Sequence, residues 1–175
     1  SILILGGSQG AQIFSFVVPN VIKMLKNAGH DIEINQQCTS GQKYFLSDFY
    51  NKNNIKSYVF EYEDNILKYF LSSNIAITRC GASTTAELVH TFTPFIAIPL
   101  PNSIDDHQYL NAKYYEKKGF CWFLDQEKLN DENLFNIILE AIKNKSKLND
   151  MSRNMEKNSN KNVYSNIENE LKKLI

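Results

Sequence analysis

The sequence has no net charge, no paired cysteine motif and no long apolar run, and each absence excludes a class of protein. Its 175 residues contain 19 basic and 19 acidic side chains, so the overall charge favours neither nucleic acid nor an anionic membrane surface as a partner. Cys38, Cys80 and Cys121 are far apart and odd in number, without a CxxC pair or a Cys/His cluster. This argues against a disulfide framework or a zinc site. We therefore expect a protein of a reducing, cytoplasmic compartment.

The amino terminus lacks both an initiator methionine and a signal-peptide pattern. The chain opens on Ser1 and an apolar run at residues 2–5, with no charged segment before it. No apolar run in the sequence approaches the length of a membrane-spanning helix. We interpret the abrupt start as a piece of a longer protein, long enough by itself to form one well-buried domain.

Short apolar runs alternate with longer segments of helical periodicity, which is typical of a parallel α/β sheet. Strands are predicted at residues 2–5, 31–36, 56–60, 75–78, 95–98 and 121–123. A helical pattern starts at residue 13, and others cover 41–50, 64–72, 83–90, 105–118, 131–143, 147–157 and 163–175. Pro19 is expected to kink the first helix or to separate its first turn. The fold prediction is a single doubly wound, Rossmann-like α/β domain with a six-stranded parallel sheet.

A glycine-rich loop at residues 6–10 (GGSQG) follows the first strand. Glycine lets a ligand approach the backbone closely, and the helix that follows directs the positive end of its dipole towards an anion. Ser8 is the residue that we expect to bind phosphate, because its hydroxyl and its N–H can both reach an oxygen. The loop is neither GxGxxG nor a P-loop with its lysine. A plain tight turn between strand and helix therefore stays open as the alternative.

The second candidate is the stretch at residues 75–87 (IAITRCGASTTAE), in which a strand ends in a glycine turn that opens into a helix. Such a helix start presents unpaired N–H groups to an anion, most often a phosphate. Glu87, one turn inside the helix, could accept hydrogen bonds from a ribose diol. The alternative interpretation is a capping box, with Thr84 as the N-cap and Glu87 three residues further on.

A third polar turn follows a proline-rich loop. His107, Gln108 and Asn111 lie within one helical turn of each other, so they can point at a ligand together. Asp105 and Asp106 could simply stabilise the helix dipole. A metal site formed by these two carboxylates and His107 is disfavoured, because the sequence suggests no further ligand. All three turns should emerge at the carboxyl edge of one sheet, where α/β domains bind ligands.

Together the three turns predict a phosphorylated ligand with a sugar-like polar end. None of them supplies a nucleophile beside a base: there is no GxSxG elbow, and no cysteine is placed with a histidine in the sequence. A binding domain therefore fits the sequence better than a self-contained catalyst.

Four motifs, in this order and spacing, carry a resemblance to a known family. They are GGSQGA at residues 6–11, RCGASTTAE at 79–87, PFIAIPLP at 94–101 and DHQYLNA at 106–112. Together they resemble the C-terminal half of the MurG family of N-acetylglucosaminyltransferases, which have the two-domain GT-B architecture. The resemblance spans nearly all of the chain and implies a donor-binding domain at residues 1–162. It also implies that a helix at residues 163–175 returns to the N-terminal acceptor domain.

In the family that the chain resembles, this half holds UDP-N-acetylglucosamine. The resemblance implies that Ser8 contacts the diphosphate, Glu87 the ribose hydroxyls, and Gln108 with His107 the sugar hydroxyls. A backbone contact to uracil would fall near Glu63. The helix start that would face phosphate and sugar is formed by Ala82, Ser83, Thr84, Thr85 and Ala86.

The activity implied by the resemblance is inverting transfer of N-acetylglucosamine to lipid I, which gives lipid II in peptidoglycan synthesis. Backbone N–H donors and the helix dipole, rather than a tightly bound metal, would meet the charge that develops on the diphosphate. No cofactor is expected. The general base, the lipid I site and the membrane contact would belong to the N-terminal half, so this chain alone is expected to be inactive. The full-length protein would be peripheral on the cytoplasmic face of the bacterial inner membrane, with no nucleic acid partner.

Three other functions fit parts of the same pattern. Another GT-B enzyme, a UDP-sugar 2-epimerase, would need carboxylates and a histidine at the sugar, and only His107 with Asp105 or Asp106 is placed for that. A free-standing nucleotide-sugar binding module would need no partner domain. A Rossmann dehydrogenase is the least favoured, because GxGxxG and an acidic residue after the second strand are both missing.

Overall fold

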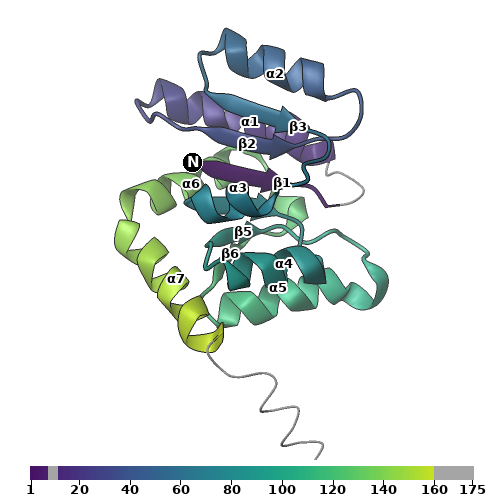
Figure 1. Cartoon of the computed structure of the whole chain (residues 1–175), viewed down its shortest axis with the longest axis vertical. Helices are drawn as coiled ribbons and strands as arrows, with labels where there is room; N and C mark the ends of the chain where they lie inside the picture. The colour runs from purple at the N-terminus through teal and green to yellow at the C-terminus, as the bar shows by residue number, and fades with distance from the viewer. Residues whose placement is uncertain (8–11, 160–175) are drawn as a thin grey trace, which may run out of the picture.

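The computed structural model describes residues 1–7 and 12–159, in which helices cover both faces of one parallel sheet (Figure 1). The six strands pair in the order β3-β2-β1-β4-β5-β6, and every pair is parallel. This is the doubly wound order, which reverses between β1 and β4, so the predicted fold class is confirmed. The strands are β1 (Ile2–Leu5), β2 (Ile34–Gln37), β3 (Ser57–Phe60), β4 (Ile75–Thr78), β5 (Phe95–Ala97) and β6 (Cys121–Phe123).

The helices form two layers that α7 connects. The α-helices are α1 (Gln12–Asn27), α2 (Lys43–Lys52), α3 (Leu67–Ser72), α4 (Ala82–His90), α5 (His107–Lys117), α6 (Asp131–Lys143) and α7 (Lys145–Ser159); the short 3-10 helices are η1 (Ile104–Asp106) and η2 (Gln126–Lys128). Helices α1, α2 and α6 pack on one face of the sheet, and α3, α4 and α5 on the other. Helix α7 runs from one layer to the other (Figure 1), because Met151 is buried in the first core and Met155 in the second.

The alternation of side chains along β1 shows why one strand serves two cores. Ile2 and Ile4 pack with Phe14 of α1, whereas Leu3 and Leu5 pack in the other core, with α3 and α4. All four residues of β1 are buried, as expected for a central parallel strand covered on both faces. Each such side chain contributes about 1.5–3 kcal/mol of burial free energy.

The second strand is shorter than predicted, because the two neighbouring strands begin opposite Ile34 and not opposite Asp31. The register pairs Ile34 with Ile2 of β1 and with Ser57 of β3. Residues 31–33 therefore lie beyond the first residue of both partners, and the strand begins at Ile34. The predicted bounds of two helices are also wrong by two residues at each end. Helix α2 spans Lys43–Lys52 instead of residues 41–50, and α7 spans Lys145–Ser159 instead of residues 147–157. The helix predicted at residues 163–175 lies outside the described residues.

Pro19 does not separate a first turn from the first helix: α1 is continuous from Gln12 to Asn27, and the proline is buried. An interior proline removes one helix hydrogen bond and costs about 3 kcal/mol in an isolated helix. Here its neighbours Val18, Val21 and Ile22 are fully buried in the core, so tertiary packing outweighs the local cost.

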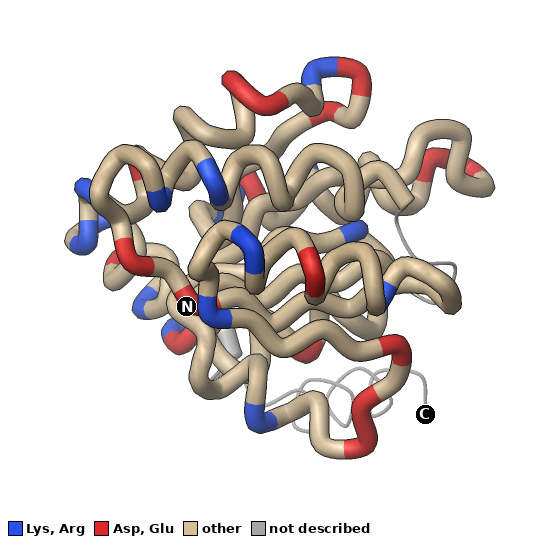
Figure 2. The backbone as a smooth tube through the Cα atoms, turned by 90° about the horizontal axis from the view of Figure 1, so that it is seen from above, with Lys and Arg blue, Asp and Glu red and all other residues tan. Residues whose placement is uncertain are grey.

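Acidic and basic residues are interspersed over the backbone, and neither sign dominates the view of the described residues in Figure 2. This agrees with the balanced composition of the whole sequence. Within the part of the chain that the structure describes, no helix is both long enough and apolar enough to span a membrane.

Candidate functional site

The ends of β1, β4 and β5 lie side by side at the carboxyl edge of the sheet, and the three candidate turns leave from there. Leu5 pairs with Thr78 at the ends of β1 and β4, and Thr78 pairs with Ala97 at the end of β5. The strand order reverses between β1 and β4, and doubly wound sheets bind ligands at such a switch point. The strands β1, β4 and β5 thus end at the one edge from which the turns were predicted to emerge. Ser8 itself lies outside the described residues.

Helix α4 begins with free N–H groups. Its N-cap is Gly81, which has no side chain to accept from them, and the first N–H with a helical partner is that of Thr85, 3.1 Å from the Gly81 carbonyl oxygen. Among the described residues, nothing accepts from the N–H groups of Ala82, Ser83 and Thr84. Ala82 and Ser83 are exposed. These N–H groups, with the helix dipole behind them, can therefore bind an anion.

The glycine at the N-cap leaves open space beside this helix start. Gly81 has φ −64° and ψ 146°, a conformation that any residue adopts, so the backbone does not demand glycine there. A Cβ atom at this position would meet no other atom within 4 Å. Neither conformation nor packing explains the glycine, and its effect is to leave the backbone N–H groups accessible to a ligand.

The side chains at the start of α4 divide between solvent and core. Glu87 and Ala86 are exposed, whereas Thr85 is fully buried and its hydroxyl donates to the Gly81 carbonyl oxygen at 2.9 Å. The side chain of Thr85 is thus not available to a ligand in this structure. Because the helix begins at Ala82, position 84 is its third residue rather than its N-cap, and the capping-box alternative is wrong.

Arg79 holds a buried positive charge two residues before the N-cap of α4. Its Nη1 donates to the carbonyl oxygens of Ile98 and Pro99 at 3.2 and 3.0 Å, and its Nη2 donates to the side-chain oxygen of Gln126 at 2.5 Å. Burial lowers the pKa of Arg79 from its ordinary value. Among the described residues no carboxylate pairs with it, so its charge raises the potential at this edge of the sheet. Arg79 has no role among the functions expected from the sequence.

Gln108 and Asn111 bond to the backbone of the turn before α4. The Oε1 atom of Gln108 accepts from the N–H of Cys80 and from the N–H of Leu100, both at 3.1 Å. The Nδ2 atom of Asn111 donates to the Cys80 carbonyl oxygen at 3.1 Å. These side chains, which were predicted to point at a ligand together, are thus bonded in part to the protein backbone. Among the described residues, the amide nitrogen of Gln108 has no hydrogen-bond partner. The Cys80 thiol is buried, and burial raises its pKa to about 12.

The helix predicted at residues 105–118 is divided near its start. Asp105 and Asp106 have left-handed φ values of 50° and 53°, so η1 ends there and α5 begins at His107. Aspartate tolerates this conformation better than most residues. The exposed His107 lies with its Nδ1 atom 2.7 Å from the Ile104 carbonyl oxygen, which can only accept, so Nδ1 is the donor in this bond. Among the described residues, no three potential metal ligands come together.

Glu63 follows β3 at the same edge of the sheet. Its carboxylate accepts from the Asn65 N–H and from the hydroxyl of Tyr58, both at 3.1 Å, and pairs with Lys68 at 3.3 Å. The bond from the Asn65 N–H, with those from Lys68 and Tyr58, lowers the pKa of Glu63. The carboxylate orders a turn at residues 64–66, and α3 begins only at Leu67, three residues later than predicted.

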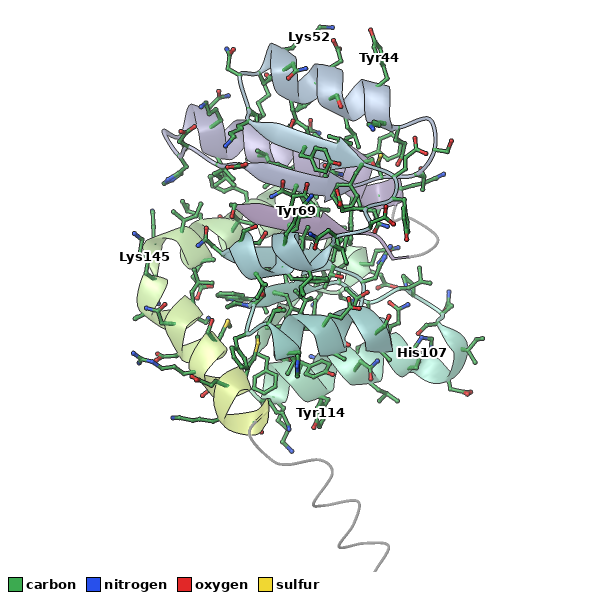
Figure 3. The ribbon with its side chains drawn as sticks, viewed as in Figure 1. Tyr44, Lys52, Tyr69, His107, Tyr114 and Lys145 are labelled. Carbon is green, nitrogen blue, oxygen red and sulfur yellow. The ribbon has the colours of Figure 1, made fainter. Side chains whose placement is uncertain are left out.

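A cavity of about 720 Å³ lies at the opposite, amino edge, where Ser1, Asn74 and Pro94 line it together with residues of α6 and α7. It shares no residue with the three turns. A hollow of about 210 Å³ at the carboxyl edge is lined by the loop at residues 99–102 with Asp106, Tyr109 and Asp125. Figure 3 shows His107 on the side towards which β1 points and Lys145 on the opposite side. Free donors and strand topology, rather than cavity size, place the candidate site at the carboxyl edge.

The fold and this edge define the class of protein: a doubly wound α/β domain whose switch point carries an open helix N-terminus suited to an anion. The family model described as the glycosyltransferase family 28 C-terminal domain matches residues 1–167. The chain belongs to this family.

Curated relatives of the chain share one name, UDP-N-acetylglucosamine--N-acetylmuramyl-(pentapeptide) pyrophosphoryl-undecaprenol N-acetylglucosamine transferase. The chain is 38% identical to the relative from Pelagibacter ubique over 168 residues, which cover 95% of the chain and 47% of the relative. It is 40% identical to the relative from Rickettsia prowazekii over 157 residues, which cover 89% of the chain and 41% of the relative. The chain thus spans less than half the length of these relatives.

Solved structures of similar fold include MurG of Acinetobacter baumannii, with a TM-score of 0.80 and 26% identity over 90% of this chain and 45% of that one. Os79 of O. sativa, solved in complex with UDP, has a TM-score of 0.67 and 19% identity over 90% of this chain and 36% of that one. The first likeness confirms the resemblance to the C-terminal half of MurG, and the second shows the fold alone.

Proposed function

We propose that this chain is the donor-binding half of a glycosyltransferase that transfers N-acetylglucosamine from UDP-N-acetylglucosamine to lipid I with inversion. The observation that carries the proposal is the uncapped start of α4 at the switch point, with Glu87 exposed one turn further on. Relatives 38–40% identical to the chain bear the name of such a transferase. Both the free N–H groups at the start of α4 and the similarity to these relatives therefore favour UDP-N-acetylglucosamine as the donor.

In this proposal the chain's residues bind the donor and stabilise its leaving group. The N–H groups of Ala82, Ser83 and Thr84 would bind the diphosphate, and the buried charge of Arg79 would add to the positive potential that UDP meets as it departs. Glu87 would accept hydrogen bonds from the ribose hydroxyls. These donors are in place before the reaction, so little reorganisation is needed when negative charge develops.

The parts that the reaction still lacks would come from the other half of the full-length protein. A general base to take the proton of the acceptor hydroxyl, the lipid I site and the membrane contact are all assigned there. The full-length protein would accordingly work at the cytoplasmic face of the bacterial inner membrane. The sugar itself would lie against α5, where the free amide nitrogen of Gln108 and the Nε2 atom of His107 can bond to its hydroxyls.

The experiment is calorimetric titration of the chain with UDP-N-acetylglucosamine, UDP-glucose and UMP. We expect UDP-N-acetylglucosamine to bind most tightly, because it offers the diphosphate, the ribose and the acetamido sugar together. UMP should bind most weakly, because it lacks the second phosphate that the α4 N-terminus is placed to meet. Failure of the chain to bind UDP-N-acetylglucosamine at millimolar concentration would sink the proposal.

A further inference from the structure

Among the described residues, every hydrogen-bond partner of the buried Arg79 side chain is uncharged. Its Nη1 atom donates to the carbonyl oxygens of Ile98 and Pro99. Its Nη2 atom donates to the Oε1 atom of Gln126 at 2.5 Å, and its guanidinium carbon lies 5.1 Å from the centre of the Phe14 ring. Buried charges in proteins are usually paired with an opposite charge. Arg79 is therefore unusual, because its positive charge is held entirely by neutral groups.

This charge lies among the strand ends that carry the candidate site. The backbone N–H of Arg79 donates to the carbonyl oxygen of Leu5, the last residue of β1, at 3.3 Å, and its side chain bonds to the loop after β5. Gly81, the N-cap of α4, comes two residues later. A charge in the protein interior acts over several ångströms, because salt screens it far less than it screens an exposed charge. Arg79 can therefore attract an anion at the start of α4 without touching it.

Gln126 bonds to this guanidinium without cancelling its charge. It is half-buried and begins the 3-10 helix η2 after β6. A carboxylate in the same place would be the stronger acceptor, because hydrogen bonds that involve ionised groups are about twice as strong as neutral ones. A carboxylate would also neutralise the guanidinium. The amide oxygen thus supplies the bond and leaves the positive potential at this edge of the sheet intact.

We propose that Gln126 is a positioning residue that holds the guanidinium of Arg79 in place while leaving its charge free to attract the diphosphate of the donor. The inference rests on the proposed function and adds to it a residue that acts on the ligand only through Arg79. A charge fixed before the donor arrives stabilises the diphosphate without having to reorganise. The neutrality of the side chain at position 126 therefore matters for binding rather than for stability.

Two substitutions of Gln126 separate its hydrogen bond from its neutrality. Gln126→Glu keeps an acceptor oxygen beside Arg79 but neutralises the charge, whereas Gln126→Met removes the acceptor and keeps the charge. The melting temperature should hold or rise with glutamate and fall with methionine. The affinity for UDP in calorimetry should fall by about tenfold with glutamate, as expected when a unit charge near the ligand is cancelled, and by less with methionine. A purely structural role of Gln126 predicts the opposite order of affinities.

The control for the added negative charge is Asn130→Asp, four residues further along the same loop. Asn130 is exposed and caps α6 by accepting from the Asn133 N–H at 2.8 Å, which aspartate does equally well. Asn130 is not among the groups to which the described Arg79 side chain donates. Since an exposed charge is screened by salt, this variant should change UDP affinity by less than about twofold.

A second measurement follows the electrostatic potential at the diphosphate itself. In ³¹P spectra of bound UDP, the pKa of the terminal phosphate should be higher with Gln126→Glu than with the unsubstituted chain, because a weaker positive potential disfavours the dianion. Gln126→Met and Asn130→Asp should leave this pKa nearly in place. A loss of packing alone would not move it in this pattern.

The outcomes separate this inference from the proposed function. If the unsubstituted chain binds no UDP, the proposed function fails and takes the role of Gln126 with it. If the chain binds UDP but Gln126→Glu binds it as tightly as Asn130→Asp does, the proposed function stands and the inference is overturned. A phosphate pKa that is the same in both variants overturns it too. So does a Gln126→Glu variant that melts below Gln126→Met, because a carboxylate beside an unneutralised guanidinium must stabilise the fold.

Discussion

Arg79 and Gln126 are 47 residues apart in sequence, yet the guanidinium of the first donates to the side-chain oxygen of the second at 2.5 Å. Arg79 follows β4, and Gln126 begins the 3-10 helix η2 after β6. The same guanidinium bonds two carbonyl oxygens after β5. One buried side chain thus joins the ends of three neighbouring strands at the carboxyl edge.

Replacing Arg79 by methionine should destabilise the domain by about 2–3 kcal/mol, because carbonyl oxygens buried without a donor remain behind. Lysine should restore only part of the loss, because its compact ammonium cannot reproduce the planar fork. The measurement is the free energy of unfolding in urea. Arg153→Met is the control: Arg153 is exposed, 3.7 Å from Asp150, and its loss should change stability by less than about 0.5 kcal/mol. Equal stability of the two methionine variants would contradict the role of Arg79.

Ser83→Asp separates the stability of α4 from its capacity to bind an anion. A carboxylate in the first turn interacts favourably with the helix dipole, so the free energy of unfolding should rise by about 0.3–1 kcal/mol. The same carboxylate would compete for the free N–H groups and repel a diphosphate, so UDP affinity should fall. Ser83→Ala should change stability little, because Ser83 is exposed. It leaves the backbone N–H groups in place and adds no charge, so UDP affinity should fall far less than with aspartate. UDP binding that is unaffected by Ser83→Asp would place the diphosphate elsewhere.

Glu87→Ala tests the ribose contact. Among the described residues no side chain bonds to the Glu87 carboxylate, so the melting temperature should hardly change. UDP binding should weaken by about 1–3 kcal/mol, as expected when hydrogen bonds to a charged group are lost. The control is a UDP analogue without ribose hydroxyls, which should bind the alanine variant and the unsubstituted chain equally. An equal loss for both ligands would argue against a ribose contact.

The fold could be predicted from the sequence because its signals are local and repeated. Each central strand is a short run of buried apolar residues such as Ile2–Leu5, and each is followed by a helix. The helix at Asp131–Lys143 was predicted to the residue, since it combines strong apolar periodicity with an Asn130 side chain that caps it. The predicted bounds were wrong where neighbouring strands determine the first residue of an element, as at Ile34.

The details of the site depend on tertiary contacts that no local pattern contains. Nothing in the sequence shows that the side-chain oxygen of Gln108 accepts hydrogen bonds from two backbone N–H groups, or that Arg79 is buried. The left-handed turn at Asp105 and Asp106 is compatible with aspartate but is not demanded by it. The motif at the start of α4 was visible in sequence, whereas the side chains that hold it in place were not.

Tyr50 and Gln36 form a buried polar pair, and the effects of replacing them on the free energy of unfolding should be strongly coupled. The Tyr50 hydroxyl donates to the Gln36 Oε1 atom at 2.6 Å, and both residues are fully buried. Burial raises the pKa of Tyr50, and among the described residues the Gln36 amide nitrogen has no partner. Tyr50→Phe and Gln36→Met should each cost about 1–3 kcal/mol by orphaning the other group. The double variant should cost less than the sum in urea unfolding; additive losses would show that the bond contributes nothing.

The stability of the domain should depend on pH through Glu63 and Tyr58, in directions that follow from their pKa shifts. The hydrogen bond to the Glu63 carboxylate raises the pKa of Tyr58 above its ordinary 10.0, while the bond from the Asn65 N–H, with those from Lys68 and Tyr58, lowers the pKa of Glu63 below 4.5. The contribution of Glu63 to stability is therefore complete above pH 4.5 and is lost as pH falls through its lowered pKa. The contribution of Tyr58 is complete below pH 10 and is lost as pH rises through its raised pKa.

The phenol titration of Tyr58 checks this directly. In chains labelled with ¹³C at the tyrosine Cζ atom, Glu63→Gln should shift the Tyr58 midpoint down towards its ordinary value, because the carboxylate that disfavours the phenolate is gone. Glu61→Gln removes an exposed carboxylate two residues before Glu63 and should leave the midpoint in place, because among the described residues it is Glu63, and not Glu61, that bonds to the Tyr58 phenol. Equal shifts in the two variants would mean that the general field of acidic residues, rather than the 3.1 Å hydrogen bond, governs the titration of Tyr58.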